Sequence, residues 1–175
     1  MPTIRDRALQ TLVKLALEPE WEARFEPNSF GFRPGRSCWD AIQAIFYSIH
    51  KKDKYVLDAD IAKCFDRIDH EALLAKVNTG PTLTRQLRAW LKAGILDGGS
   101  LFPSERGTPQ GGAISPLLAN IALHGMEELI LRRFRPRTVK GERLNAPTLV
   151  RYADDCAPRR REGSGTGPDS ERHAA

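Results

Sequence analysis

Three aspartates follow short β-favouring runs and could together hold divalent cations. Asp60 follows the run 55–57, and Asp154 and Asp155 follow a second run that ends at Tyr152. Carboxylates at strand ends can converge even when they are distant in the chain. A hard cation such as Mg²⁺ relieves their mutual repulsion, because it prefers oxygen ligands together with substrate phosphates. Two such ions roughly 3.5–4 Å apart can serve an in-line displacement at phosphorus.

A plainer interpretation of the same aspartates is that they are turn and cap residues on a solvated edge, which is the commoner role of such a pair. Asp58 is a competing candidate, since on a strand it would share a face with Asp60. An aromatic residue, Phe65, follows Asp60 after five positions, but the residues alone leave the choice between the two aspartates open.

The spacing of apolar residues predicts several helices to carry these acids. Apolar residues recur every three or four positions in four segments, 8–16, 42–49, 83–91 and 118–129. Asp6, Ser37 and Asp69 can each cap a helix, and Pro19 is expected to interrupt the first one. The runs 55–57 and 148–152 favour strands.

Two loops of small residues lie between these elements. Residues 29–37 form a basic loop punctuated by glycine and proline, and residues 107–112 form a second loop that leads into a helix. A helix N-terminus beside small residues suits close approach by a nucleotide.

Together these segments resemble the group II intron-encoded reverse transcriptase/maturase family. The resemblance covers residues 2–155 and rests on several motifs in the right order, whereas YADD alone would be weak. Three segments resemble palm motifs: YVLDADIAKCFDRIDH (55–70), GTPQGGAISPLLANIAL (107–123) and YADD (152–155). SFGFRPGRSCWDAI (29–42) resembles a fingers segment, and PTIRDRALQ (2–10) resembles the segment before it.

The resemblance implies an enzyme, an RNA-directed DNA polymerase that transfers nucleotides with two Mg²⁺ ions. Asp60 and Asp154 would be the principal metal ligands and Asp155 a third acid. Asp60 is preferred to Asp58 because Phe65 follows it at the spacing of the family's motif. The backbone carbonyl of Ile61 would be an additional ligand. The expected partners are template or intron RNA, a DNA primer and dNTPs.

The resemblance also implies residues that would contact substrate or nucleic acid. Phe65 would lie under the incoming sugar as a steric gate, and Gln110 and Gly111 would line the nucleotide and template pocket. Arg33 and Arg36 would contact the template backbone or intron RNA, since the guanidinium fork suits phosphate. The plainer alternatives are a core aromatic, a loop amide and a solvated basic loop.

We therefore expect an α+β fold, a palm-like small antiparallel sheet with packed helices and partial helical fingers, incomplete at both ends. We assign residues 1–155 to a partial reverse transcriptase domain and residues 156–175 to a disordered tail. Pro158 and the arginines after it disfavour a strand that would close the acidic hairpin, and we hypothesise a reading-frame shift just after Asp155. A hairpin lacking that strand would be poorly preorganised, so we expect little or no activity from this chain alone.

Composition is compatible with this function. The 27 basic and 22 acidic residues give a net charge of +5, which favours a polyanionic partner. The three cysteines form no close pair, so a disulfide framework or zinc site is not expected. No membrane span or signal peptide is apparent, and we expect a cytoplasmic protein. A non-catalytic RNA-binding or maturase remnant that assists splicing, and a remnant that folds poorly, remain as alternatives.

Overall fold

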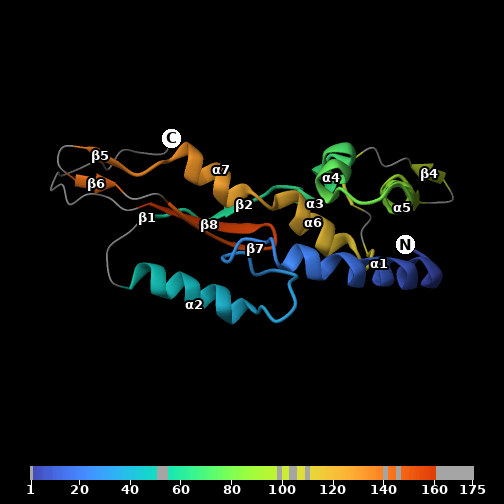
Figure 1. Cartoon of the computed structure of the whole chain (residues 1–175), viewed down its shortest axis with the longest axis horizontal. Coiled ribbons are helices and arrows are strands. Elements are labelled where there is room, and N and C mark those ends of the chain that lie inside the picture. Colours follow the sequence, from blue (N-terminus) through green and yellow to red (C-terminus); the bar gives the residue numbers. More distant parts are fainter. Residues whose placement is uncertain are drawn as a thin grey trace.

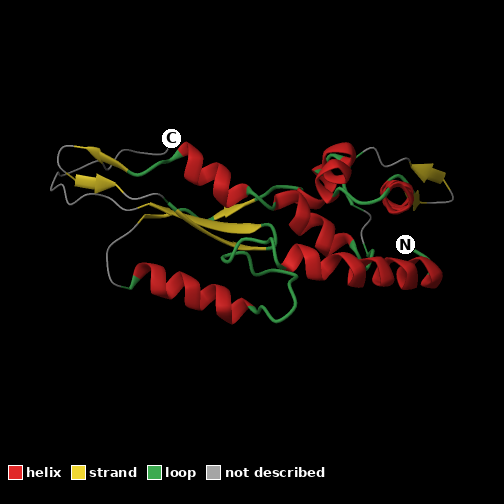
Figure 2. Cartoon of the chain, viewed as in Figure 1, coloured by secondary structure: helices red, strands yellow, loops and turns green. Residues whose placement is uncertain are grey.

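The computed structural model describes residues 2–50, 55–97, 100–102, 106–108, 111–139, 142–144 and 147–160. Figure 1 shows an elongated molecule with a sheet near its middle and a group of helices at the end that holds the N-terminus. The same view coloured by secondary structure shows that helices predominate around this sheet (Figure 2). Within the described residues, no helix is both long enough and apolar enough to cross a bilayer.

A helical core occupies the N-terminal end of the molecule. It is built by α1 (Ile4–Glu22), α3 (Cys64–Arg67), α4 (His70–Val77), α5 (Pro81–Leu91) and α6 (Ser115–Leu123). Leu118 and Ile121 of α6 are at its centre, with 2% and 0% of their surfaces exposed. Two short hairpins are separate from the main sheet, β3 (Ile95–Asp97) with β4 (Ser100–Phe102) and β5 (Arg137–Val139) with β6 (Glu142–Leu144).

Helix α1 differs from its prediction at both ends. Thr3 is the N-cap, and Asp6 completes a capping box with it instead of being the cap itself. The helix also continues through Pro19, which was expected to interrupt it. Leu17 and Trp21 are buried on either side of this proline, so their packing offsets the backbone hydrogen bond that proline cannot donate.

Two other helix starts are confirmed. Ser37 caps α2 (Cys38–Ile49), and its hydroxyl and the Asp40 carboxylate form a capping box. Asp69 precedes α4, and its carboxylate accepts a hydrogen bond from the amide of Ala72 at 2.8 Å.

The predicted helix over 118–129 is divided in two. Helix α6 ends at Leu123 and α7 (Met126–Arg133) begins after Gly125, whose φ of 91° ordinary residues rarely adopt. The Glu26 carboxylate accepts a hydrogen bond from the Gly125 amide and pairs with His124 Nδ1 at 3.0 Å. The break between α6 and α7 is therefore held by specific contacts. A single glycine in the sequence was not a sufficient signal to predict it.

The main sheet is small and antiparallel, as predicted. It contains β1 (Tyr55–Val56), β2 (Ala59–Asp60), β7 (Thr148–Tyr152) and β8 (Asp155–Arg160). Strand β8 is central, because it pairs with β7 on one edge and with β1 and β2 on the other.

Strand β8 corrects the prediction that the chain lacks strand structure after Asp155. Every residue from 156 to 160 pairs with a neighbouring strand, and Cys156 and Arg159 pair on both edges, whereas residues 161–175 lie outside the described part. Pro158 is tolerated because the opposite strand is interrupted between Val56 and Ala59, across from Ala157 and Pro158. The ladder is thus already broken where proline lacks its donor.

The sheet separates two layers. Helix α2 lies along one face, where Ala41 packs with Phe30 and Val150 of β7. Arg151 of β7 points to the other face, where its guanidinium contacts Asn120 of α6. We call these the α2 face and the α6 face.

Candidate functional site

The structure brings the three predicted acids to one end of the sheet. Asp60 of β2 lies directly opposite Asp155 of β8 in the antiparallel register. The amide of Ile61 donates to the backbone carbonyl of Asp154 at 3.3 Å. Directly opposed residues have Cα atoms about 4.5–5.5 Å apart. Residues 95 positions apart in the chain are therefore neighbours.

The acids and Arg151 occupy opposite faces of this end of the sheet. Asp60, Asp155 and Tyr152 form a cross-strand row that is exposed on the α2 face. Ala59, Cys156 and Arg151 form the next row and point to the α6 face.

Two carboxylates directly opposite each other repel, and a bound cation would relieve that repulsion. The oxygen donors of Asp60, Asp154 and Asp155 suit Mg²⁺ in chemical type. Among the described residues, however, no three Asp, Glu, His or Cys side chains converge closely enough to hold a metal ion. The three acids are thus of the chemical type that Mg²⁺ prefers, and two of them are opposite each other in the sheet. That their side chains converge on a bound ion stays a prediction.

The electrostatics place all three acids in one neighbourhood. Burial raises the pKa of the Cys64 thiol, and the charges of Asp154 and Asp60 raise it further while Arg151 opposes them. Burial likewise raises the pKa of the Cys156 thiol, with Arg151 opposing it and Asp155 and Asp60 adding to it. Both thiols are therefore protonated at neutral pH, and neither is an activated nucleophile.

The Ile61 carbonyl, the predicted additional ligand, accepts a hydrogen bond from the amide of Cys64 at 3.0 Å. Because a carbonyl oxygen has two lone pairs, one acceptor position remains for another group. Lys63 follows with φ of 56°, a left-handed conformation that is uncommon for a lysine. The backbone just after Asp60 is thus a tight turn.

An aromatic pair lies beside this turn, of which Phe65 was predicted as a site residue and Phe32 was not. Phe65 is half-buried, and its ring makes a T-shaped contact with the Phe32 ring, with centroids 6.1 Å apart. Phe32 is 49% exposed and has φ of 59°, a conformation that its sequence context did not reveal. Phe65 is therefore placed between the core and the surface, where its role as a gate stays a prediction.

The loop that was predicted to line the nucleotide pocket docks beside Phe65. The amide of Thr108 donates to the Phe65 carbonyl at 2.8 Å. A Cβ on Gly107 would lie 2.6 Å from that same carbonyl, so only glycine permits this approach. Gly111 is exposed with φ of 81°, and Gln110 lies outside the described residues.

The structure corrects the prediction for Arg33. Its side chain is 4% exposed, and Nε and Nη2 contact the Glu22 carboxylate at 2.8–3.1 Å. Nη1 donates to the carbonyls of Glu26 and Ser29, so the guanidinium is engaged inside the protein and is not available to RNA. The sequence of the basic loop gives no sign of this ion pair with Glu22.

Arg36, in contrast, is exposed and remains a candidate for nucleic-acid contact. Its guanidinium lies 5.5 Å from the centre of the Phe30 ring, and Nη1 is 3.4 Å from the Pro27 carbonyl oxygen. These weak contacts leave most of its donors directed to solvent.

Sequence reasoning missed two buried polar residues behind the acidic turn. Arg151 and Asn120 are 2% and 1% exposed and hydrogen-bond to each other. Burial lowers the pKa of the Arg151 guanidinium, and the nearby Glu26 charge opposes this shift. An arginine nonetheless stays protonated in proteins. The only sequence signal was a charged residue inside a strand next to the acids.

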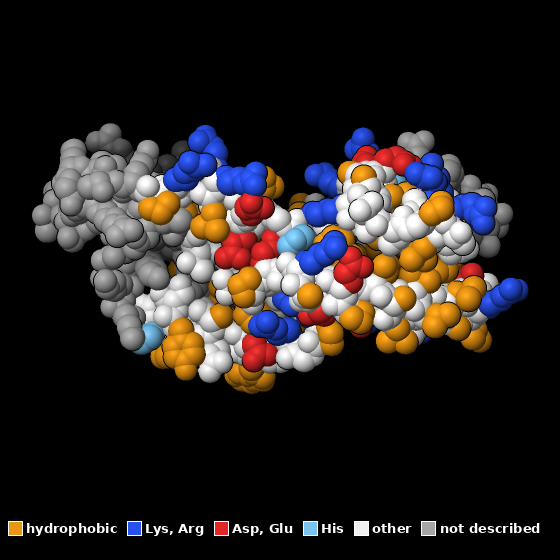
Figure 3. Space-filling view, viewed as in Figure 1, with side chains coloured by type: hydrophobic (Ala, Val, Ile, Leu, Met, Phe, Trp, Pro, Cys, Tyr) orange, Lys and Arg blue, Asp and Glu red, His pale blue; other side chains and the backbone are white. Residues whose placement is uncertain are grey.

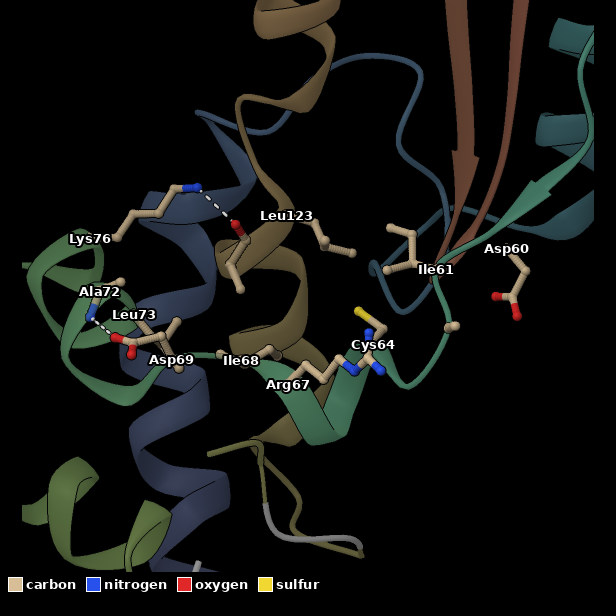
Figure 4. Close-up of a pocket in the computed structure, with 12 residues that line it drawn as sticks. Asp60, Ile61, Cys64, Arg67, Ile68, Asp69, Ala72, Leu73, Lys76 and Leu123 are labelled. Atoms are coloured by element: carbon tan, nitrogen blue, oxygen red, sulfur yellow. Dashed lines mark hydrogen bonds between the residues drawn. The ribbon is translucent and has the colours of Figure 1, made fainter. Parts of the chain in front are cut away.

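A cavity of about 720 Å³ opens beside Asp60, between α3, α4 and α6. Figure 4 shows Asp60 at one end of its lining and Lys76 and Asp69 at the other, with Ile61 and Cys64 between them. Neither Asp154 nor Asp155 lines this cavity. In the space-filling view, acidic side chains gather near the middle of the visible face, bordered by lysines and arginines (Figure 3).

Comparison with known proteins shows the family of the chain. Residues 1–158 match the family model described as reverse transcriptase (RNA-dependent DNA polymerase). The chain belongs to the reverse transcriptase family. This confirms the resemblance seen in the sequence, and it makes the enzyme class an RNA-directed DNA polymerase by family.

Its relatives among reverse transcriptases include group II intron proteins. Group II intron-encoded protein LtrA of Lactococcus lactis subsp. cremoris is 38% identical over 135 residues, 75% of this chain and 22% of LtrA. Protein YkfC of Escherichia coli is 34% identical over 141 residues, 77% of this chain and 37% of YkfC. The chain thus spans well under half of these relatives.

The fold of this reverse transcriptase chain is also found in a solved structure. A chain of a Cas6-RT-Cas1–Cas2 complex superposes with a TM-score of 0.52 and 24% identity, covering 93% of this chain and 17% of the other. At this identity the likeness supports the fold alone. The predicted α+β fold, with a small antiparallel sheet and packed helices, is confirmed.

Proposed function

We propose that this chain carries the metal-binding centre of an RNA-directed DNA polymerase of group II intron type. The observation that carries the proposal is the strand register that places Asp60 opposite Asp155. Next to this pair, the Ile61 amide donates a hydrogen bond to the Asp154 carbonyl. Family membership supplies the reaction class, and this geometry supplies the acids on which the reaction would depend.

Two Mg²⁺ ions bound there would activate a primer 3′-hydroxyl and stabilise the leaving pyrophosphate. Asp60 and Asp154 would hold them, with Asp155 as a further acid and the free lone pair of the Ile61 carbonyl as an additional oxygen. The exposed row on the α2 face leaves the carboxylates of Asp60 and Asp155 open to a substrate, and Asp154 is partly exposed beside them. The tight turn after Asp60 fixes the Ile61 carbonyl relative to them.

The residues around the acids would select the nucleotide and contact nucleic acid. Phe65 would meet the sugar of the incoming dNTP and exclude a ribose hydroxyl, with Phe32 supporting its ring. Gly111 and Gln110 would line the pocket for the nucleotide and template. Arg36 is the proposed contact to the phosphates of template or intron RNA, because its guanidinium is exposed.

Binding of Mn²⁺, followed by electron paramagnetic resonance, tests the centre without requiring turnover. We expect Asp60→Asn and Asp154→Asn each to weaken binding strongly, because each removes a charged ligand. Asp58→Asn is the matched control, since Asp58 is exposed on the same edge and lies between β1 and β2. Equal binding by Asp60→Asn and the unsubstituted chain would refute the proposal.

Extension of a DNA primer on an RNA template with Mg²⁺ tests the reaction itself. We expect little extension by this chain alone, since it spans 22% of LtrA. Any extension that occurs should disappear in Asp154→Ala, and extension that survives this substitution would contradict the assigned centre.

A non-catalytic RNA-binding role is separated from this proposal by salt and substitution. The exposed Arg36 and the net charge of +5 predict RNA binding that weakens as salt rises. Retained RNA binding in Asp60→Asn, together with unchanged Mn²⁺ binding in that variant, would favour the non-catalytic role.

A further inference from the structure

Arg151 is a buried arginine whose side chain joins three segments that are far apart in the sequence. Nη1 donates to Asn120 Oδ1 of α6 at 3.0 Å and to the Ala153 carbonyl at 2.8 Å. Nη2 donates to the Ser29 hydroxyl at 2.6 Å. Asn120 in turn donates to the Gly31 carbonyl at 2.8 Å. Because the guanidinium is planar and its donors have fixed directions, these bonds fix the relative positions of the segments.

The loop that contains Ser29 and Gly31 also binds the backbone of Arg151. The Arg151 amide donates to the Asn28 carbonyl and the Phe30 amide donates to the Arg151 carbonyl, both at 2.9 Å. The contact is so close that a Cβ on Gly31 would lie 2.2 Å from the Ala153 nitrogen. The loop therefore covers the edge of β7 that β8 leaves free.

We propose that Arg151 is the positioning residue of the acidic turn, on the assumption that the proposed metal centre is correct. Its guanidinium holds the Ala153 carbonyl from the α6 face, and this keeps Asp154 and Asp155 in register with Asp60 on the other face. Ligands that must meet an ion need such support, because a carboxylate on a mobile turn spends little time in the binding geometry.

Arg33 provides a matched control within the same protein. It is also buried and also binds the loop, through the Ser29 carbonyl, but its main partner is the Glu22 carboxylate. Within the part of the chain that the structure describes, none of the Arg33 side-chain hydrogen bonds reaches the acidic turn. Loss of Arg33 should therefore affect stability without acting on the acids selectively.

The test is the Mn²⁺ affinity of Arg151→Met, measured at a temperature at which circular dichroism shows the variant to be folded. We expect an affinity loss of about tenfold to a hundredfold, the usual effect of removing a residue that orients metal ligands. Arg33→Met should lower the melting temperature yet leave the Mn²⁺ affinity of the folded protein unchanged. Hydrogen exchange should accelerate at residues 152–156 in Arg151→Met only.

Two further variants keep the proposal testable if Arg151→Met does not fold. Arg151→Lys keeps the charge but cannot reach three acceptors from one plane, so it should not restore the affinity. Ser29→Ala removes only the Nη2 acceptor and should give a smaller loss in the same direction. Unchanged affinity in both variants would overturn the proposal. If Asp60→Asn also binds Mn²⁺ normally, the proposed function fails as well; if Asp60→Asn does not bind, only the role of Arg151 fails.

Discussion

The helical core and the acidic sheet are stabilised in different ways. Fifteen buried apolar residues form one continuous cluster across α1, α4, α5 and α6 and the segments that join them. The described apolar cluster under β7 contains only Phe30, Ala41 and Val150 as buried members. The sheet compensates with buried hydrogen bonds and a close backbone contact at Gly31. Apolar burial thus builds the scaffold, and a polar network positions the acids.

The largest expected effect comes from a cavity in the helical core. Leu118→Ala removes a side chain that is 2% exposed at the centre of the cluster. We expect the free energy of unfolding to fall by about 2–5 kcal/mol, as for other buried leucines. Urea denaturation followed by circular dichroism measures this. A loss below about 1 kcal/mol would mean that the cluster is not the main source of stability.

The next effect should be confined to the sheet. Gly31→Ala places a Cβ 2.2 Å from the Ala153 nitrogen, so the loop or the acidic turn must move. We expect a loss of about 1–3 kcal/mol, typical of overpacking, with faster hydrogen exchange at residues 150–156.

Gly80→Ala is the control for that substitution. Gly80 precedes α5, and a Cβ there would meet nothing within 4 Å. Gly80 is the N-cap of α5, where alanine is less favourable than glycine, so we expect a loss of at most about 1 kcal/mol. Equal effects at the two glycines would show that the close contact between loop and turn is not important for stability.

A smaller effect is expected at the C-terminal end of α6, within the helical core. The ammonium of Lys76 donates to the carbonyls of Ala122 and His124 at the end of α6. Lys76→Met leaves these carbonyls without that donor, and we expect a loss of about 1 kcal/mol by thermal denaturation. An unchanged melting temperature would mean that water replaces the ammonium without cost.

The smallest effect should depend on pH. Burial raises the pKa of Glu26, but hydrogen bonds from His124, its own amide and the Gly125 amide outweigh this and hold it below its ordinary value of 4.5. A lowered pKa stabilises the fold above the ordinary value, and this stabilisation is lost as the pH falls through the lowered pKa. Stability should therefore decline less steeply below pH 4.5 in Glu26→Gln. Identical pH profiles would exclude this contribution.

Local signals in the sequence predicted much of the fold. Ser37 and Asp69 cap helices because a hydroxyl or carboxylate next to a helical pattern satisfies free amides regardless of the rest of the chain. The strand beginning at Tyr55 and the one ending at Tyr152 follow from β-branched and aromatic residues. Pro19 was misjudged, because tertiary packing at Trp21 outweighed a local preference.

The parts that were missed depend on contacts between distant segments. The composition after Asp155 disfavours a strand, yet β8 forms there, and the interruption of the partner strand between Val56 and Ala59 explains how Pro158 fits. Arg33 was expected in solvent, because its ion pair with Glu22 requires the loop to fold back on α1. The convergence of the three acids was expected from their positions at strand ends and from the motif resemblance, but no local pattern could have supplied the register that places Asp60 opposite Asp155.

Iron-directed cleavage of the backbone tests the central claim most directly. Fe²⁺ in place of Mg²⁺, with ascorbate and peroxide, should cut the chain both near Asp60 and near Asp154–Asp155. Mg²⁺ should compete, and Asp60→Asn should abolish both sets of cuts while Asp58→Asn keeps them. Cuts at only one of the two segments, or cuts that persist in Asp60→Asn, would contradict a shared metal centre.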